Sequence, residues 1–232
     1  MFVQATKTEL TAIRLLFSSK WTLLLLVMIY GGLLGVGYLF VSTREATITQ
    51  LVVTLVLVVV APVLFFALQT VCVNYVSGPT TVRKIVYDSL RLIAVSLPLI
   101  VMTAVAVYGL GKIHSHQTVV VAVRYLLVGL IALLLAIQLW AAASRDGLRS
   151  LLRRLHHLAI GAFAPQSVFV YSLGILFFVV APYLLIFHTT QTERAWLEVS
   201  LLVVRLAVGA LLILFGWVTT VGTLSLLSKN RC

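Results

Sequence analysis

The sequence predicts an all-α integral membrane protein with six transmembrane helices arranged as three hairpins, each preceded by a basic amphipathic interfacial helix. The first observation is composition: 62% of the 232 residues are hydrophobic and 10% are charged, against about 45–50% and about 25% in soluble domains. The second is a set of six long apolar runs, each able to cross about 30 Å of hydrocarbon. The third is a basic segment before every odd-numbered run. We therefore expect a single transmembrane domain over 1–232.

The six spans are bounded by charged or turn-rich segments. The first run is longer than the ~7–15-residue apolar region of a signal peptide, and no A-x-A-like site precedes Arg44 and Glu45, so we expect it to be retained. Each later run also reaches the about 17–25 residues that a crossing helix needs. The predicted helices cover residues 21–41, 48–76, 92–110, 119–143, 167–187 and 196–227.

Three basic segments, residues 6–20, 81–91 and 144–163, are predicted to form helices that lie in the membrane interface. In the third, Leu148, Leu151 and Leu155 follow helical spacing, while arginines and histidines occupy the other faces. A helix in the headgroup layer satisfies both kinds of face. The alternative is that these segments are the inner ends of tilted transmembrane helices.

Loop charges predict the orientation. Most of the 17 lysines and arginines lie in the segments on the N-terminal side of the membrane, whereas the opposite loops hold only Arg44, Lys112 and Arg194. The positive-inside rule therefore places both termini in the cytoplasm.

The basic residues beside the helix ends are interpreted as contacts with anionic lipid, because no nucleic-acid-binding fold or aromatic stacking motif accompanies them. Nucleic acid is therefore not an expected partner. The candidate lipid contacts are Arg83, Lys84, Arg91, Arg145, Arg149, Arg153 and Arg154.

An internal repeat is consistent with the hairpins. Successive odd-numbered spans, and successive even-numbered spans, are offset by about 71 to 77 residues, as a tandem unit of interfacial helix plus hairpin would give. A competing match, 59–62 against 179–182, would instead fit an inverted repeat of the kind found in transporters. The hairpin triplet accounts for more of the chain.

One stretch carries a family resemblance. Asn74-Tyr75-Val76-Ser77-Gly78, followed by Arg83-Lys84 and Ser89-Leu90-Arg91-Leu92, resembles the join between helices in bacterial multi-helix membrane families, including the membrane domain beside some glycerophosphodiester phosphodiesterases. The resemblance covers about a third of the chain and implies a multi-pass protein of the bacterial inner membrane. The chain has no phosphodiesterase catalytic domain, so that activity does not carry over.

Polar side chains inside the spans are the candidate functional residues. Arg124 and Arg205 lie in the outer halves of the fourth and sixth spans. An arginine costs about 2.5–3.5 kcal/mol at the bilayer centre and less toward the interface. Glu198 precedes Arg205 by two helical turns and is its candidate partner. With Gln69 in the second span, these residues are the candidate polar or anion site. The alternative for the arginines is a structural or snorkelling role.

Catalytic chemistry is not indicated. No metalloprotease, Walker or nucleophile-elbow motif is present, and His114, His116 and His188 lack companions at metal-ligand spacing. We therefore expect no cofactor and no enzyme activity. The leading hypothesis is an accessory or scaffold subunit of a membrane complex, in contact with lipids and partner subunits. The alternative is a small-solute or lipid transporter.

Overall fold

The computed structural model describes residues 2–43, 47–78, 81–112, 117–188 and 194–229, without the side chains at 2–4, 117, 148–150, 152–154 and 195. Over these residues the chain is helical and contains no strand. Six helices in the described part are long and apolar enough to cross a membrane. The prediction of an all-α, multi-pass membrane protein is confirmed at this level.

The helices follow five of the predicted spans within a few residues, whereas the helix of the third begins ten residues before its predicted start at 92. A capping box at Thr47 and Gln50 starts the second span, and Ser19 caps the first by accepting a hydrogen bond from the Thr22 backbone N–H. In chain order the elements are α1 (Phe2–Ser18), α2 (Lys20–Ser42), α3 (Ile48–Asn74), η1 (Tyr75–Ser77), α4 (Val82–Gly111), α5 (Gln117–Leu126), η2 (Leu127–Ala132), α6 (Leu133–Asp146), α7 (Leu148–Ala162), α8 (Pro165–Ile175), η3 (Leu176–Val180), α9 (Ala181–Phe187) and α10 (Ala195–Lys229).

Two of the basic segments differ from their predicted extents. The separate helix predicted over 81–91 is not found, because α4 runs without a break through this segment into the third span. The helix predicted over 144–163 is divided: Asp146 ends α6, and α7 begins at Leu148. Gly147 between them has φ of +77°, a conformation that glycine adopts at helix ends without a steric cost.

The fourth and fifth spans each contain a π-helical segment, η2 and η3. In the fifth span, Pro182 is the second residue after η3. Proline lacks the N–H that would continue the α-helical ladder, and its ring crowds the preceding turn, so a wider turn is accommodated there. In the fourth, the Tyr171 hydroxyl of α8 donates to the Gly129 carbonyl in η2. The widened turn thus provides an acceptor that joins two spans.

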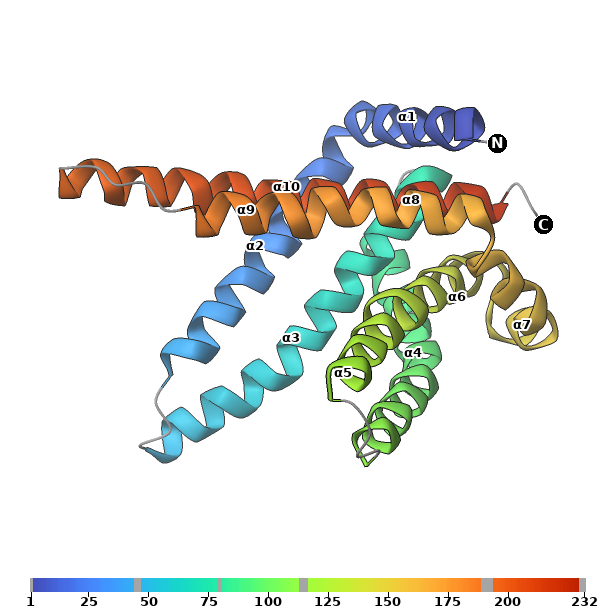
Figure 1. Cartoon of the computed structure of the whole chain (residues 1–232), viewed down its shortest axis with the longest axis horizontal. Coiled ribbons are helices and arrows are strands. Elements are labelled where there is room, and N and C mark those ends of the chain that lie inside the picture. Colours follow the sequence, from blue (N-terminus) through green and yellow to red (C-terminus); the bar gives the residue numbers. More distant parts are fainter. Residues whose placement is uncertain (1, 44–46, 79–80, 113–116, 189–193, 230–232) are drawn as a thin grey trace.

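The six spans diverge from one end of the molecule (Figure 1). Three pairs of consecutive spans, α2 with α3, α4 with α5–α6 and α8–α9 with α10, point in different directions from the region where α1 and α7 also lie. We call this end the base. Its buried residues are concentrated in the ranges 66–75, 85–96, 134–143, 167–174 and 214–228.

The other half of each span is hardly buried at all. We call these segments the outer halves; they are residues 27–42, 48–65, 97–111, 118–133, 176–187 and 196–213. Among their described residues, only Leu57, Pro182 and Gly209 are buried. The spans therefore share most of their buried residues at the base, and many apolar side chains of the outer halves are exposed.

The helices α1 and α7 both pack at the base. Leu16 of α1 is fully buried, and Phe17 stacks on Phe215 of α10 with ring centroids 6.0 Å apart. In α7, Leu151 and Leu158 are buried against α4 and α6. Part of each predicted amphipathic stripe thus contacts protein.

The packing of α10 on η1 depends on the absence of a side chain at Gly222. A Cβ there would lie 2.0 Å from the Tyr75 hydroxyl oxygen, and the Tyr75 ring is itself buried. We predict that Gly222→Ala lowers the free energy of unfolding by about 1–3 kcal/mol. The measurement is unfolding in detergent micelles, followed by circular dichroism.

Gly109 is the matched control, since a Cβ there would meet nothing within 4 Å. Gly109→Ala should leave stability unchanged or raise it, because alanine favours a helix by about 1 kcal/mol over glycine. Equal stabilities of the two variants would contradict the close approach of Tyr75 to α10.

Candidate functional site

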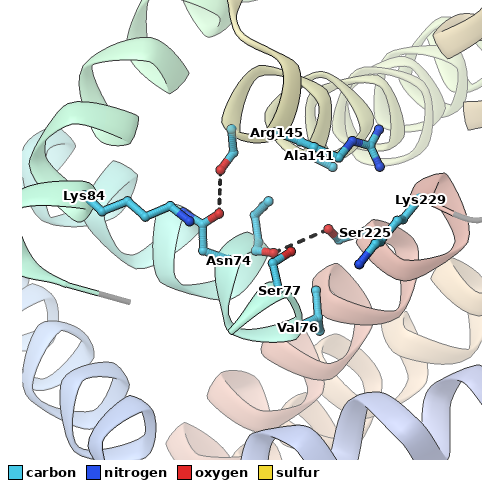
Figure 2. Close-up of a pocket in the computed structure, with 10 residues that line it drawn as sticks. Asn74, Val76, Ser77, Lys84, Ala141, Arg145, Ser225 and Lys229 are labelled. Carbon is cyan, nitrogen blue, oxygen red and sulfur yellow. Dashed lines mark hydrogen bonds between the residues drawn. The ribbon is translucent and has the colours of Figure 1, made fainter. Parts of the chain in front are cut away.

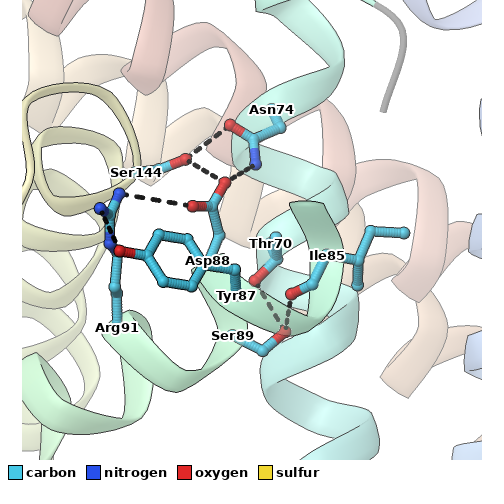
Figure 3. A network of polar contacts seen from close by, with 8 residues as sticks. All are labelled: Thr70, Asn74, Ile85, Tyr87, Asp88, Ser89, Arg91 and Ser144. Atoms are coloured by element: carbon cyan, nitrogen blue, oxygen red, sulfur yellow. Dashed lines mark hydrogen bonds and ion pairs between the residues drawn. The ribbon is translucent and has the colours of Figure 1, made fainter. Parts of the chain in front are cut away.

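A buried carboxyl group lies where three helices meet in the base (Figure 3). Asp88 of α4 is 2% exposed. The Asn74 side-chain amide of α3 donates to its Oδ2 at 2.8 Å, and the Ser144 hydroxyl of α6 lies 3.3 Å from the same oxygen. Ser144 also donates to Asn74 Oδ1 at 2.6 Å. Each member thus contacts the other two, and the cluster joins α3, α4 and α6.

The other carboxylate oxygen of Asp88 faces a cation. Arg91 Nη1 lies 3.7 Å from Asp88 Oδ1, and its Nη2 donates to the Tyr87 hydroxyl at 2.9 Å. The guanidinium carbon lies 4.1 Å from the Tyr87 ring centroid. A buried carboxylate is tolerated when it is paired and hydrogen-bonded, and these contacts provide both conditions.

Two further hydrogen bonds continue the connection along the same helices. The hydroxyls of Thr70 in α3 and Ser89 in α4 lie 3.1 Å apart (Figure 3). The Trp140 indole N–H of α6 donates to Ser96 of α4 at 2.7 Å. In an apolar medium such bonds between helices contribute about 0.6 kcal/mol each. The base is therefore joined by polar contacts as well as by apolar packing.

Next to this cluster is a pocket of about 210 Å³, lined by the ends of α3, α6 and α10 and by the start of α4 (Figure 2). Three cations line it, and each comes from a different helix: Lys84, Arg145 and Lys229. None of its described lining residues is acidic, and they also include Asn74, Ser77, Ser144 and Ser225. Its chemistry suits an anion, because charge-assisted donors converge on one small volume.

Gln69, one of the predicted site residues, has a packing role. It is 1% exposed and accepts a hydrogen bond from the Trp217 indole N–H of α10 at 2.9 Å. The pocket that it lines is otherwise formed by apolar and aromatic residues, among them Tyr30 and Phe65. Neither Arg124 nor Arg205 lines that pocket.

The two intramembrane arginines occupy equivalent places in different pairs of spans. Arg205 donates to the His188 carbonyl at the end of α9. The Arg124 guanidinium lies against Gly111 at the end of α4, where a Cβ would come within 2.4 Å of Nη2. Helix C-termini carry unpaired carbonyls and a partial negative charge. Both arginines are thus close to the end of the preceding span.

These contacts do not bring the predicted polar site together. Glu198 is exposed, and the described part of the chain shows no ion pair between it and Arg205. Arg124 is half-buried, and its Nε has no hydrogen-bond partner among the described residues. Gln69, Arg124 and Arg205 each have different neighbours.

The predicted lipid contacts have varied environments. Arg83 is exposed, Lys84 and Arg145 line the basic pocket, and Arg91 contacts Asp88. Arg149, Arg153 and Arg154 lie on α7, but their side chains are outside those described, as are residues His114 and His116 altogether.

Sequence reasoning missed Asp88 and Lys229 as site residues. Asp88 lies three residues after Ile85 and four before Leu92. Those two residues are buried, so an acidic residue at helical spacing between them indicates a buried carboxylate. The convergence of Lys229 with Lys84 had no comparable signal, because it depends on how α10 packs on α3.

Comparisons with protein-family models, with curated proteins and with solved structures find no match to this chain. The resemblance to bacterial multi-helix membrane families therefore stays a prediction.

Two buried glutamines are expected to respond oppositely to substitution. Gln69→Leu removes the acceptor of the Trp217 indole N–H, so we expect a loss of about 1–3 kcal/mol in unfolding free energy. Gln138 of α6 is 3% exposed, and its Nε2 has no partner in the described residues. Gln138→Leu should therefore keep or raise stability. Unfolding of both variants in mixed micelles tests this, and equal losses would contradict it.

Proposed function

We propose that this chain is a non-enzymatic accessory or scaffold subunit of a larger protein complex in the bacterial inner membrane. Its six spans form three hairpins. The base, which is rich in lysine and arginine, faces the cytoplasm, and α1 and α7 lie in the headgroup layer. The divergent outer halves receive transmembrane helices of partner subunits, and the base contacts anionic lipid.

The divergence of the outer halves is the observation that carries this proposal. Exposed leucine and valine side chains alone would not support the proposal, because lipid tails are as apolar as these side chains. The distinguishing feature is that the three pairs of spans, which are joined at the base, separate from one another over the rest of their length. Helices from another subunit would fill the space between the pairs.

A feature of α2 supports the same conclusion. Gly31 and Gly35 are one helical turn apart on one face, both are exposed, and a Cβ at either would meet nothing within 4 Å. Small residues at this spacing allow the backbones of two membrane helices to approach closely. No described helix of this chain approaches that face.

The transporter alternative has less support. It requires a polar cavity shared by Gln69, Arg124 and Arg205, and these residues have separate neighbours. The pocket beside Gln69 is lined mainly by apolar and aromatic side chains. We therefore favour the scaffold.

We predict that partner subunits are lost when the glycine face of α2 is filled. The tagged full chain would be extracted from native membranes in mild detergent, and stoichiometric partners would be measured by quantitative mass spectrometry. Gly31→Leu and Gly35→Leu should each reduce the co-purified partner by about tenfold or more, since a helix in close contact cannot accommodate the added side chain.

Gly37→Leu is the matched control. This glycine is also open, but lies on the other side of the same helix. It should retain the partner and show the same unfolding midpoint as the other variants. A chain that purifies as a lone monomer, or equal loss in all three variants, would refute the proposal.

A further inference from the structure

The basic pocket of the base brings together cations that are far apart in the sequence. Lys84 lies in the first turn of α4, Arg145 lies near the end of α6 and Lys229 ends α10, yet all three line the same volume of about 210 Å³ (Figure 2). Like charges that converge on one small pocket repel one another and raise its electrostatic potential. An anion held between them would remove that repulsion.

The nearby carboxylates do not occupy the pocket. Asp88 is held by Asn74, Ser144 and Arg91, as described above. Asp146 lies 3.4 Å from the Arg145 guanidinium, but is not a lining residue. The charge of the lining side chains that the structure describes is therefore positive, with two lysines and an arginine and no acid.

Hydrogen-bonding groups share the pocket with the cations. Three serines line the pocket. The Ser144 hydroxyl donates to Asn74 Oδ1 and the Ser225 hydroxyl to the Val73 carbonyl, so Ser77 is the serine among these described residues that presents a hydroxyl to a ligand. A phosphate group offers several strong acceptor oxygens, which suits ammonium and guanidinium donors together with a hydroxyl donor. A cation would not find matching groups there.

Apolar side chains complete the lining, namely Val73, Val76 and Ala141. The pocket thus offers charged donors beside an apolar wall. A lipid headgroup has the same division, with an anionic phosphate next to apolar chains. Free phosphate would contact the charged donors but not the apolar wall.

We propose that this pocket binds the phosphate group of an anionic phospholipid. The inference builds on the proposed function, because it requires the base to lie in the cytoplasmic headgroup layer. In place of a diffuse attraction there is a defined site, in which Lys84 and Lys229 contact the phosphate and the Ser77 hydroxyl orients it.

The test uses the purified full chain, titrated with phosphatidylglycerol and, separately, with phosphatidylcholine, with bound lipid counted by native mass spectrometry. One tightly bound phosphatidylglycerol is expected. The double variant Lys84→Gln and Lys229→Gln should lower its affinity about tenfold or more. Phosphatidylcholine, which is neutral overall, should bind more weakly and change little.

Arg83→Gln is the matched control, because Arg83 is the exposed neighbour of Lys84 and does not line the pocket. It should change phosphatidylglycerol affinity less than about twofold, and Lys84→Arg with Lys229→Arg should retain binding. Unfolding midpoints of all variants establish that they are folded. An equal loss in Arg83→Gln, or no loss in the double variant, would overturn the site in favour of diffuse attraction.

Inorganic phosphate identifies the source of the anion. Millimolar phosphate should displace little phosphatidylglycerol if the lipid chains contribute to binding, whereas full displacement would overturn the lipid proposal in favour of a soluble phosphate. Partner capture is measured independently of this titration. Lipid binding that fails while partners persist therefore rejects only the pocket, and the reverse result rejects only the scaffold.

Discussion

The carboxyl group of Asp88 is the constraint on which the base depends. A charge buried among apolar helices is unfavourable unless hydrogen bonds and a cation compensate it. Here Asn74 and Ser144 supply the hydrogen bonds and Arg91 the cation. These partners come from α3, α6 and α4 itself, so the three helices must stay in register for the charge to remain compensated.

The distribution of buried residues follows from this arrangement. In a bilayer the apolar faces of helices gain little by leaving lipid, so polar contacts and close backbone approach decide where spans associate. Both occur at the base, at Asp88 and at Gly222 beneath Tyr75. The outer halves have the arginine contacts at two helix ends, but no comparable buried cluster among their described residues. They diverge, and this leaves faces such as that of Gly31 and Gly35 available.

The spans were predictable because about 20 consecutive apolar residues are a signal that local sequence carries by itself. The division of the third basic segment at Gly147 was not predictable. The helical spacing of apolar residues continues on both sides of it, and a positive φ does not change that spacing. The continuity of α4 across residues 91 and 92 was not predicted either, although the sequence there has no glycine or proline that would mark a helix end. The pocket was the least predictable feature, because Lys84 and Lys229 meet only through tertiary packing.

The most direct test of a joined base with divergent outer halves is a set of distances between spin labels, measured by double electron–electron resonance in lipid vesicles. Labels would replace one exposed residue at each end of α2, α4 and α10, in a Cys72→Ala, Cys232→Ser background. The positions are Trp21, Arg83 and Lys229 at the base, and Val41, Tyr108 and Glu198 at the other ends. The account predicts longer distances among the outer labels than among the base labels. Outer distances equal to or shorter than those at the base would contradict it.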